Sequence, residues 1–342
     1  MFGKRIGVDL GTANVLVYVK GRGIVIAEPS VVAVAQRDNS IVAVGTEARE
    51  MLGRTPGAIQ VIRPMREGVI ADYVTTEAML RHFIGRIIGR FALVKPEVMI
   101  CVPAGVTGVE QRAVQDAAEA AGARRPAHII PEPLAAAIGA RIPVHAPQGH
   151  MIVDIGGGRT EAAVISMYGI VVTESVRVAG DRLDDAIAAY VKRRHNLIIG
   201  DRTAEELKIA IGSAVTLDDE MTYQARGRDQ ITGLPRTITV NSTEVTQAIQ
   251  DSVQAIIGAA RSVLERTPPE LASDVVDRGI VLTGGTGLLR NLDRLITQEI
   301  GIPCYVADNP LECVAMGAGI ALDHLELIKR AMPAEGEWLV SL

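Results

Sequence analysis

The sequence predicts an α/β fold of two similar lobes with a nucleotide cleft between them, because one strand–turn–strand pattern occurs twice. The first copy spans residues 5–19 and turns beside Asp9, and the second spans residues 151–165 and turns beside Asp154. Each turn is rich in glycine, which lets backbone N–H groups approach and point at an anion. With 342 residues the chain also exceeds the size at which single cores stop growing, roughly 250–300 residues. The pattern therefore indicates two lobes that hold one nucleotide between them.

Each half continues with a matching unit of strand and helix. In the first half, residues 98–102 form a buried type of strand, and Thr107 and Glu110 then have the spacing of a capping box. In the second half, residues 279–283 form the strand, and residues 288–299 carry leucine and isoleucine at helical spacing. Strands that alternate with helices predict a sheet in each half, with ligands at the carboxyl ends of the strands.

Two smaller insertions interrupt these units and predict two further subdomains. Residues 31–63 contain two short strand patterns and one short helix pattern. Residues 179–240 begin with an amphipathic helix, continue with a capping box at Thr203 and Glu206, and end in polar alternation. The longest predicted helix, over residues 243–266, follows and stops at two prolines.

The composition excludes several classes of protein. A net charge of −5 gives no indication of nucleic-acid binding. No run of about 18 apolar residues occurs, so no membrane-spanning helix is expected. The cysteines, Cys101, Cys304 and Cys313, have neither metal-ligand spacing nor a disulfide framework, which indicates a reducing cytoplasm. Cys101 lies in an apolar run and is expected to be a small buried hydrophobic residue.

A series of motifs along nearly the whole chain resembles the MreB family of bacterial actin homologues, within the actin, heat-shock chaperone and sugar kinase superfamily. The motifs are residues 7–14, 63–72, 132–139, 154–158, 179–181, 211–214 and 226–235. The resemblance implies an actin-like fold, with duplicated ribonuclease-H-like domains, two inserted subdomains and a central nucleotide cleft.

The same resemblance implies a cytoskeletal protein that binds ATP or ADP with Mg²⁺, hydrolyses ATP slowly and polymerises into filaments of identical copies. Further implied partners are membrane lipids and the proteins of cell-wall synthesis and morphogenesis, through which the filaments maintain rod shape. The implied location is the cytoplasm, peripheral at the inner face of the cell membrane.

The expected division of the chain is into four subdomains, a large and a small one in each lobe. Subdomain IA comprises residues 1–30, 64–143 and 317–342, and subdomain IB comprises residues 31–63. Subdomain IIA comprises residues 144–178 and 241–316, and subdomain IIB comprises residues 179–240.

Three glycine-rich loops supply the predicted phosphate contacts. The β-phosphate is expected to face Gly11, Thr12, Ala13 and Asn14, and the γ-phosphate to face Gly156, Gly157 and Gly158. Gly284, Gly285 and Thr286 open a helix, where close backbone approach suits the α-phosphate and the base. The alternative for residues 156–158 is a tight turn that binds no ligand. The alternative for residues 284–286 is an ordinary connection between a strand and a helix. The family usually has a third glycine where Thr286 stands.

The other residues predicted to bind the nucleotide or its metal ion are three acids and a lysine. Asp9 and Asp154, which approach each other only when the lobes close, are expected to hold a hydrated Mg²⁺; the alternative is an acid that caps a tight turn. By resemblance, Glu205 and Lys208 reach the ribose and base. An exposed ion pair on one helix face is the alternative for these two residues.

Hydrolysis requires a side chain that orients a water in line with the γ-phosphate. Glu132 is the predicted residue, because the prolines on both sides of it stiffen the backbone that aims its carboxylate; the alternative is an acid that stabilises a helix N-terminus. Thr160 could assist through its hydroxyl. Arg159 stands where the family usually has threonine, and it could act as an arginine finger, remove a hydroxyl that positions water, or point into solvent.

Membrane contact is predicted for the apolar loop that contains Phe91, Leu93 and Val94, which arginines and a lysine flank. Apolar side chains beside cations suit the headgroup region of anionic lipids, and by resemblance a loop at this position inserts into membrane. The alternative is that these residues enter the core before the strand over residues 98–102.

Two other classes of protein share the superfamily. A small-molecule kinase would need a second substrate pocket near the cleft, and the sequence alone does not exclude it. A chaperone-like ATPase would need a substrate-binding module after the nucleotide domain, and the chain stops about ten residues after Arg330. A nucleotide-driven polymer is therefore the preferred prediction.

Overall fold

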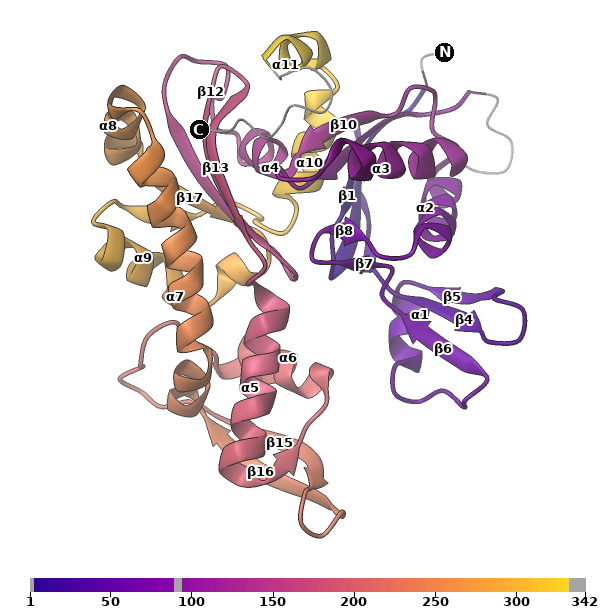
Figure 1. The fold of residues 1–342 in the computed structure, drawn as a ribbon, viewed down its shortest axis with the longest axis vertical. Helices are drawn as coiled ribbons and strands as arrows, with labels where there is room; N and C mark the ends of the chain where they lie inside the picture. Colours follow the sequence, from indigo (N-terminus) through magenta and orange to yellow (C-terminus); the bar gives the residue numbers. More distant parts are fainter. Residues whose placement is uncertain (1–2, 89–93, 332–342) are drawn as a thin grey trace.

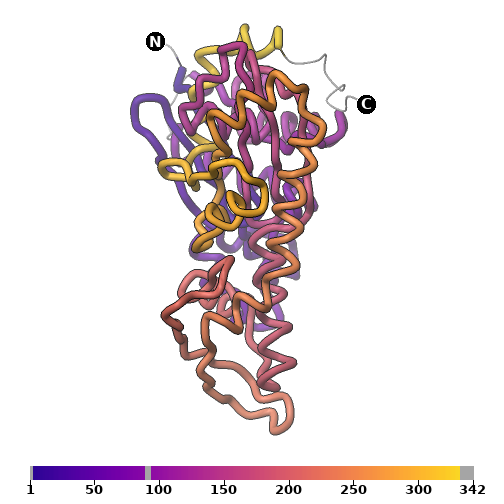
Figure 2. The backbone as a smooth tube through the Cα atoms, turned by 90° about the vertical axis from the view of Figure 1, so that its left-hand side faces the viewer, coloured from indigo at the N-terminus to yellow at the C-terminus, as the bar shows by residue number. Residues whose placement is uncertain are grey.

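The computed structural model describes residues 3–88 and 94–331, which form two lobes joined at one end (Figure 1). In a view turned by 90° the molecule is narrower and tapers toward the end built by residues 180–241 (Figure 2). Each lobe has a large five-stranded sheet and a smaller inserted sheet.

The two large sheets have the same topology. In lobe I the order is β10-β9-β1-β2-β3, and in lobe II it is β18-β17-β11-β12-β13. In both sheets the first three strands along the chain are antiparallel, and the last two strands add in parallel on the other side. The predicted duplication is therefore confirmed, strand by strand.

The strand bounds show how closely the two sheets correspond. Lobe I contains β1 (Arg5–Leu10), β2 (Asn14–Val19), β3 (Gly23–Pro29), β9 (Glu97–Val102) and β10 (His128–Pro131). Lobe II contains β11 (His150–Ile155), β12 (Thr160–Ser166), β13 (Gly169–Val176), β17 (Ile280–Thr283) and β18 (Cys304–Val306). The central strands β11 and β17 are buried at every position, which explains why most of their residues are apolar.

Helices follow the parallel strands in both lobes. α3 (Gly108–Ala120) links β9 to β10, and α9 (Leu292–Ile300) links β17 to β18. The predicted capping box at the start of α3 is confirmed: the Thr107 side chain accepts from the Glu110 N–H, and Glu110 accepts from the Thr107 N–H. α2 (Tyr73–Ile88) packs beside α3, and α7 (Ser242–Arg266) and α8 (Pro269–Arg278) cover lobe II.

The lobes share a hydrophobic core at the closed end of the molecule. α4 (Glu132–Gly139) follows β10, α10 (Cys313–Ala321) follows β18, and these two helices pack against each other. Their core includes Met99 from the lobe I sheet and Ile152 from the lobe II sheet. Cys101 belongs to this core, 3% exposed, as predicted.

The inserted sheets lie at the open end. Subdomain IB contains β4 (Val32–Ala35), β5 (Ile41–Val44), β6 (Ile59–Ile62) and α1 (Thr46–Met51). Subdomain IIB contains α5 (Gly180–His195), α6 (Asp201–Ile211), β14 (Leu197–Ile198), β15 (Thr222–Asp229) and β16 (Pro235–Asn241). A short hairpin, β7 (Met65–Arg66) and β8 (Val69–Ile70), joins subdomain IB to α2. All five sheets of the described residues fall within the predicted subdomains, except that β16 extends to Asn241. The exact boundaries stay predictions.

Two details of the predicted helices are wrong. The capping box at Thr203 is absent, because α6 begins at Asp201 and the N–H groups of Thr203 and Ala204 bond to the Gly200 carbonyl. The helix expected over residues 288–299 starts only at Leu292, after a 3-10 turn, η1 (Thr286–Leu288).

A tertiary contact explains the late start of α9. Asn291 adopts the left-handed conformation, with φ of 59°, and the Arg290 carbonyl accepts a hydrogen bond of 2.8 Å from the Ala214 N–H. This contact with Ala214, which follows α6, keeps residues 289–291 out of the α-helical conformation despite their leucine spacing.

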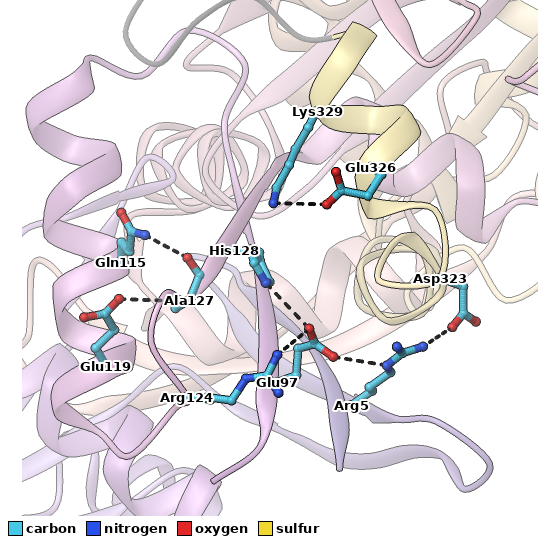
Figure 3. Close-up of polar contacts among 10 residues, drawn as sticks. All are labelled: Arg5, Glu97, Gln115, Glu119, Arg124, Ala127, His128, Asp323, Glu326 and Lys329. Atoms are coloured by element: carbon cyan, nitrogen blue, oxygen red, sulfur yellow. Dashed lines mark hydrogen bonds and ion pairs between the residues drawn. The ribbon is translucent and has the colours of Figure 1, made fainter. Parts of the chain in front are cut away.

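A charged network attaches the C-terminal helices to lobe I (Figure 3). Glu97, at the start of β9, accepts from Arg5 at 3.1 Å and from Arg124 at 3.0 Å. Arg5 also pairs with Asp323, in the segment between α10 and α11 (Leu325–Ala331). The network thus joins β1, β9 and the end of the described chain.

None of the helices in the described ranges combines the length and the apolar character needed to cross a membrane.

Candidate functional site

One cleft of about 360 Å³ lies between the two lobes. It is lined by the loops after β1, β11 and β17 and by part of α6. The predicted ligand residues on its lining are Asp9, Gly11, Thr12, Ala13, Asn14, Asp154, Gly156, Gly157, Gly158, Glu205, Lys208, Gly284, Gly285 and Thr286. The structure thus brings together every predicted nucleotide and metal residue.

The phosphate loops of the two lobes touch each other. A β-carbon at Gly158 would lie 2.7 Å from Thr12 Oγ1, so only glycine allows this approach. The Thr286 hydroxyl donates to the Gly156 carbonyl at 2.7 Å, which ties the loop after β17 to the loop after β11. Three glycine-rich loops from two lobes therefore converge on one place.

Two carboxyl groups, the half-buried Asp9 and the buried Asp154, lie beside these loops at the ends of β1 and β11. Burial, and then the charge of Asp154, raises the pKa of Asp9 to about 8. Burial raises the pKa of Asp154 to about 6, although the Thr283 hydroxyl donates to its Oδ1 at 2.7 Å and opposes that rise. Both groups therefore resist ionisation when no cation is close.

The donor set of Asp9 and Asp154 fits Mg²⁺. This ion prefers oxygen ligands and is usually held by one or two carboxylates together with phosphate oxygens and water. Among the described residues, no group of three or more His, Cys, Asp or Glu side chains could hold an ion. An ion at this position would therefore complete its coordination with phosphate oxygens or water.

Glu132 and Glu161 form a second pair of interacting carboxyl groups. Glu132 lines the cleft, and burial followed by the charge of Glu161 raises its pKa well above the usual value. Glu161 is 1% exposed, accepts from the Ala104 N–H at 3.1 Å, and has its pKa raised by burial to about 7. Sequence reasoning missed Glu161, although a lone acid within the apolar strand β12 was a signal.

The other two predicted catalytic residues are differently placed. Arg159 lines the cleft, but its Nε and Nη2 donate to the Glu67 carbonyl at 3.0 and 2.8 Å. Thr160 is fully buried and does not line the cleft, and its hydroxyl donates to the Val178 carbonyl at 2.7 Å. Because the hydroxyl hydrogen is donated to Val178, the Thr160 oxygen can only accept a hydrogen bond from another group.

Helix α6 presents its polar face to the other end of the cleft. Lys208 Nζ donates to the Gly180 carbonyl at 3.1 Å and to Asp184 Oδ2 at 2.9 Å. Glu205 pairs across the cleft with Arg49 of subdomain IB, at 2.6 Å. Asp184 was not predicted; its Oδ1 is buried without a hydrogen-bond partner in the described structure, and burial raises its pKa to about 6.

Sequence reasoning also missed the apolar walls of the cleft. Ile209, Leu288 and Leu311 line it and are 66%, 53% and 46% exposed. They come from three distant segments, so no local pattern could have identified them. Exposed apolar side chains on two sides of a cleft suit a flat apolar ligand such as a nucleobase.

The predicted membrane loop falls largely outside the described residues. Phe91 and Leu93 are not described, and Val94 is 48% exposed.

Comparisons with known proteins agree with this geometry. A family model described as MreB/Mbl protein matches residues 3–330. The cell shape-determining protein Mbl of Bacillus subtilis is 50% identical over 330 residues, which cover 96% of this chain and 99% of the relative. The cell shape-determining protein MreB of Escherichia coli is 52% identical over 332 residues, with coverage of 96% and 95%.

Among solved structures, MreB5 of Spiroplasma citri bound to ADP is similar, with a TM-score of 0.90 and 38% identity. The alignment covers 96% of this chain and 99% of MreB5. MreB5 has also been solved bound to AMPPNP. The predicted actin-like fold is thereby confirmed.

Proposed function

The chain belongs to the MreB/Mbl protein family, and on that premise we propose that it is an ATP-binding cytoskeletal protein that polymerises into membrane-associated filaments. The filaments organise cell-wall synthesis and so maintain rod shape, in line with the name of the relatives as cell shape-determining proteins. The observation that carries the proposal is the convergence of three glycine-rich loops and the carboxyl groups of Asp9 and Asp154 in one cleft between the lobes.

The proposed ligand is ATP or ADP with Mg²⁺. Backbone N–H groups of the loops after β1 and β11 bind the β- and γ-phosphates, and Asp9 and Asp154 hold the ion. When bound, Mg²⁺ neutralises phosphate charge and stabilises the leaving group. Glu205 and Lys208 reach the ribose and base, and the apolar side chains of Ile209, Leu288 and Leu311 contact the base. The ADP and AMPPNP complexes of MreB5 support this assignment.

The proposed enzymatic activity is a slow ATPase, ATP and water giving ADP and phosphate. Glu132 orients the attacking water. Thr160 does not line the cleft and Arg159 donates to the Glu67 carbonyl, so neither contacts the phosphate in this arrangement.

The central experiment measures light scattering and phosphate release after ATP and Mg²⁺ are added to the purified protein. Scattering should rise with ATP and the rise should be lost in Asp154→Ala. Asp251→Ala is the matched control, since it removes an exposed carboxylate from α7. A different result would indicate a small-molecule kinase. In that case ATP would be consumed only when a small hydroxyl-bearing acceptor is present, and scattering would not rise.

The proposed position of the filaments is the inner face of the cell membrane, through the loop that contains Phe91, Leu93 and Val94. Sedimentation with anionic liposomes tests this contact. Phe91→Ser combined with Leu93→Ser should reduce co-sedimentation, whereas Val109→Ser, which removes a side chain that is 82% exposed on α3, should not. Equal sedimentation of all three proteins would eliminate the loop as the anchor.

A further inference from the structure

Helix α5 brings one buried carboxylate to the cleft that the sequence did not predict. Asp184, in the second turn of α5, lines the cleft, and its Oδ2 accepts a hydrogen bond from Lys208 Nζ at 2.9 Å. Its Oδ1 is also buried, and it receives no hydrogen bond from the described part of the chain. Because a buried acceptor without a donor is unfavourable, this oxygen is the place at which a ligand in the cleft would supply a donor.

The position of Asp184 along the cleft indicates which part of a nucleotide lies beside it. Its partner Lys208 also donates to the Gly180 carbonyl, at 3.1 Å. Gly180 adjoins the second phosphate loop, because its N–H donates to the Gly156 carbonyl at 3.2 Å. Ile209, which follows Lys208 in α6, belongs to the apolar wall assigned to the base. Asp184 thus lies between the phosphate loops and the base wall, where a nucleotide has its sugar.

Asp184 and Lys208 recognise different hydrogen-bonding groups. A lysine ammonium group only donates, so Lys208 can bond to the oxygen of a hydroxyl group but cannot receive its hydrogen. Burial raises the pKa of Asp184 to about 6, although Lys208 opposes the rise, so at pH 7 the carboxylate is mostly ionised and only accepts. Asp184 Oδ1 therefore needs an O–H or N–H group, and the sugar of a nucleotide offers only its hydroxyls.

Two other acids of α5 and α6 line the cleft, but both form ion pairs with subdomain IB. Glu205 pairs with Arg49 at 2.6 Å, and Asp181 lies 3.9 Å from Arg63. The side chains of Glu205 and Asp181 are each 38% exposed, whereas that of Asp184 is 15% exposed. A hydrogen bond to a buried carboxylate discriminates more strongly between ligands, because water replaces it less readily.

We propose that Asp184 is a specificity-determining residue that accepts a hydrogen bond from a ribose hydroxyl and so selects ribonucleotides over deoxyribonucleotides. This inference rests on the proposed function, to which it adds a contact with the sugar. Lys208 fixes the carboxylate through Oδ2 and leaves Oδ1 for the ligand. A deoxynucleotide that lacks the hydroxyl leaves Oδ1 buried without a donor, which is the source of the selectivity.

The test combines a variant of Asp184 with removal of the hydroxyl from the ligand. Dissociation constants of ADP, 2′-deoxy-ADP and 3′-deoxy-ADP are measured with Mg²⁺ for the wild type and for Asp184→Ala. The wild type should bind at least one of the deoxynucleotides about tenfold more weakly than ADP, as expected for one lost hydrogen bond. In Asp184→Ala this ratio should fall to about one, because the two changes remove the same hydrogen bond.

The ratio separates recognition of the sugar from a structural role. If Asp184 only held Lys208 in place, Asp184→Ala would weaken all three nucleotides equally, the wild-type ratio would persist, and the proposal would be wrong. Asp185→Ala is the matched control, since it removes the next carboxylate of α5, which is 72% exposed and does not line the cleft. This variant should keep the wild-type ratio.

A second variant keeps the partner of the carboxylate. In Asp184→Asn the amide oxygen can still accept from Lys208, and the amide hydrogens then replace the acceptor in the cleft, so the ratio should fall here as well. Thermal melting without nucleotide checks that each variant is folded.

The wild type alone distinguishes failure of this proposal from failure of the proposed function. Equal affinity of the wild type for ADP and both deoxynucleotides would overturn the role of Asp184 and leave nucleotide binding intact. A wild type that binds none of the three would reject the proposed function itself.

Discussion

Asp9, Asp154 and Glu132 line the cleft, and the buried Glu161 is near enough for its charge to act on Glu132. Desolvation raises the pKa of all four carboxyl groups. Like charges at close range cannot all ionise without a cation. At the scale of single residues, therefore, the cleft is arranged for a ligand that arrives with a divalent ion, and it is strained at neutral pH without one.

This arrangement predicts that the ligand-free protein loses stability as the pH rises. Asp9 has a usual pKa of 3.8 and a folded pKa of about 8, so between these values the folded chain binds a proton that the unfolded chain does not. Its stabilising contribution is full below the usual pKa and is lost as the pH rises to about 8.

Asp9→Asn should remove this pH dependence and stabilise the ligand-free protein at pH 8 by at least about 1 kcal/mol, while weakening Mg²⁺-dependent nucleotide binding. Urea unfolding between pH 5 and pH 8 provides the measurement, with Asp251→Asn as the control. Parallel stability curves for the wild type and Asp9→Asn would contradict the assignment.

At the scale of secondary-structure elements, local signals were reliable where sequence neighbours complete the interaction. The capping box of Thr107 and Glu110 needs only the residues between them, and it formed as predicted. The similar spacing at Thr203 did not, because Gly200 supplied an earlier helix start. The late start of α9 has a different cause, a contact with Ala214 that is far away in the sequence.

The crossing of α4 and α10 depends on glycine at the contact. A β-carbon on Gly317 would lie 1.7 Å from the Ala135 carbonyl oxygen, a separation that no small adjustment relieves. Gly317→Ala should therefore destabilise the protein by roughly 2–3 kcal/mol through overpacking.

A helical glycine at which a β-carbon would meet no other part of the protein provides the control. At Gly258 in α7, no atom lies within 4 Å of the place that a β-carbon would take, so Gly258→Ala should stabilise by up to about 1 kcal/mol through helix propensity. Urea unfolding midpoints compare the two variants. If both shifted in the same direction, close packing of α4 on α10 would not be the cause.

At the scale of the whole molecule, the lobes meet in two chemically different ways. Their closed end is a shared apolar core around α4 and α10. Their open end is polar, with Arg49 paired to Glu205 and Arg63 lying 3.9 Å from Asp181, on either side of a cavity of about 150 Å³. Such a molecule can open at the polar end while its apolar hinge stays packed.

The ion pair of Arg49 with Glu205, which crosses this opening, should control nucleotide release. An exposed ion pair contributes only about 0–1 kcal/mol to folding, so Arg49→Ala should leave the melting temperature nearly unchanged. It should nevertheless speed nucleotide release several-fold, because a contact that holds the lobes together is lost.

Stopped-flow measurement of the release rate of a fluorescent ADP analogue tests this effect. Rising salt should accelerate release from the wild type by screening the pair and have less effect on Arg49→Ala. Arg54→Ala is the control, since Arg54 lines the same cavity and makes no ion pair within the described part of the chain. Identical release rates at every salt concentration would refute the role of Arg49.

The sequence by itself determined the duplicated sheets and the convergence of their glycine-rich loops, since apolar strands and glycine turns are local patterns that recur in both halves. Only the tertiary structure decided which side chains meet across the lobes: the apolar walls at Ile209 and Leu311, the buried Glu161, and the contact of Arg159 with the Glu67 carbonyl. The reason is physical. A strand or turn follows from neighbours along the chain, whereas these contacts join segments that folding brings together and that no spacing in the sequence relates.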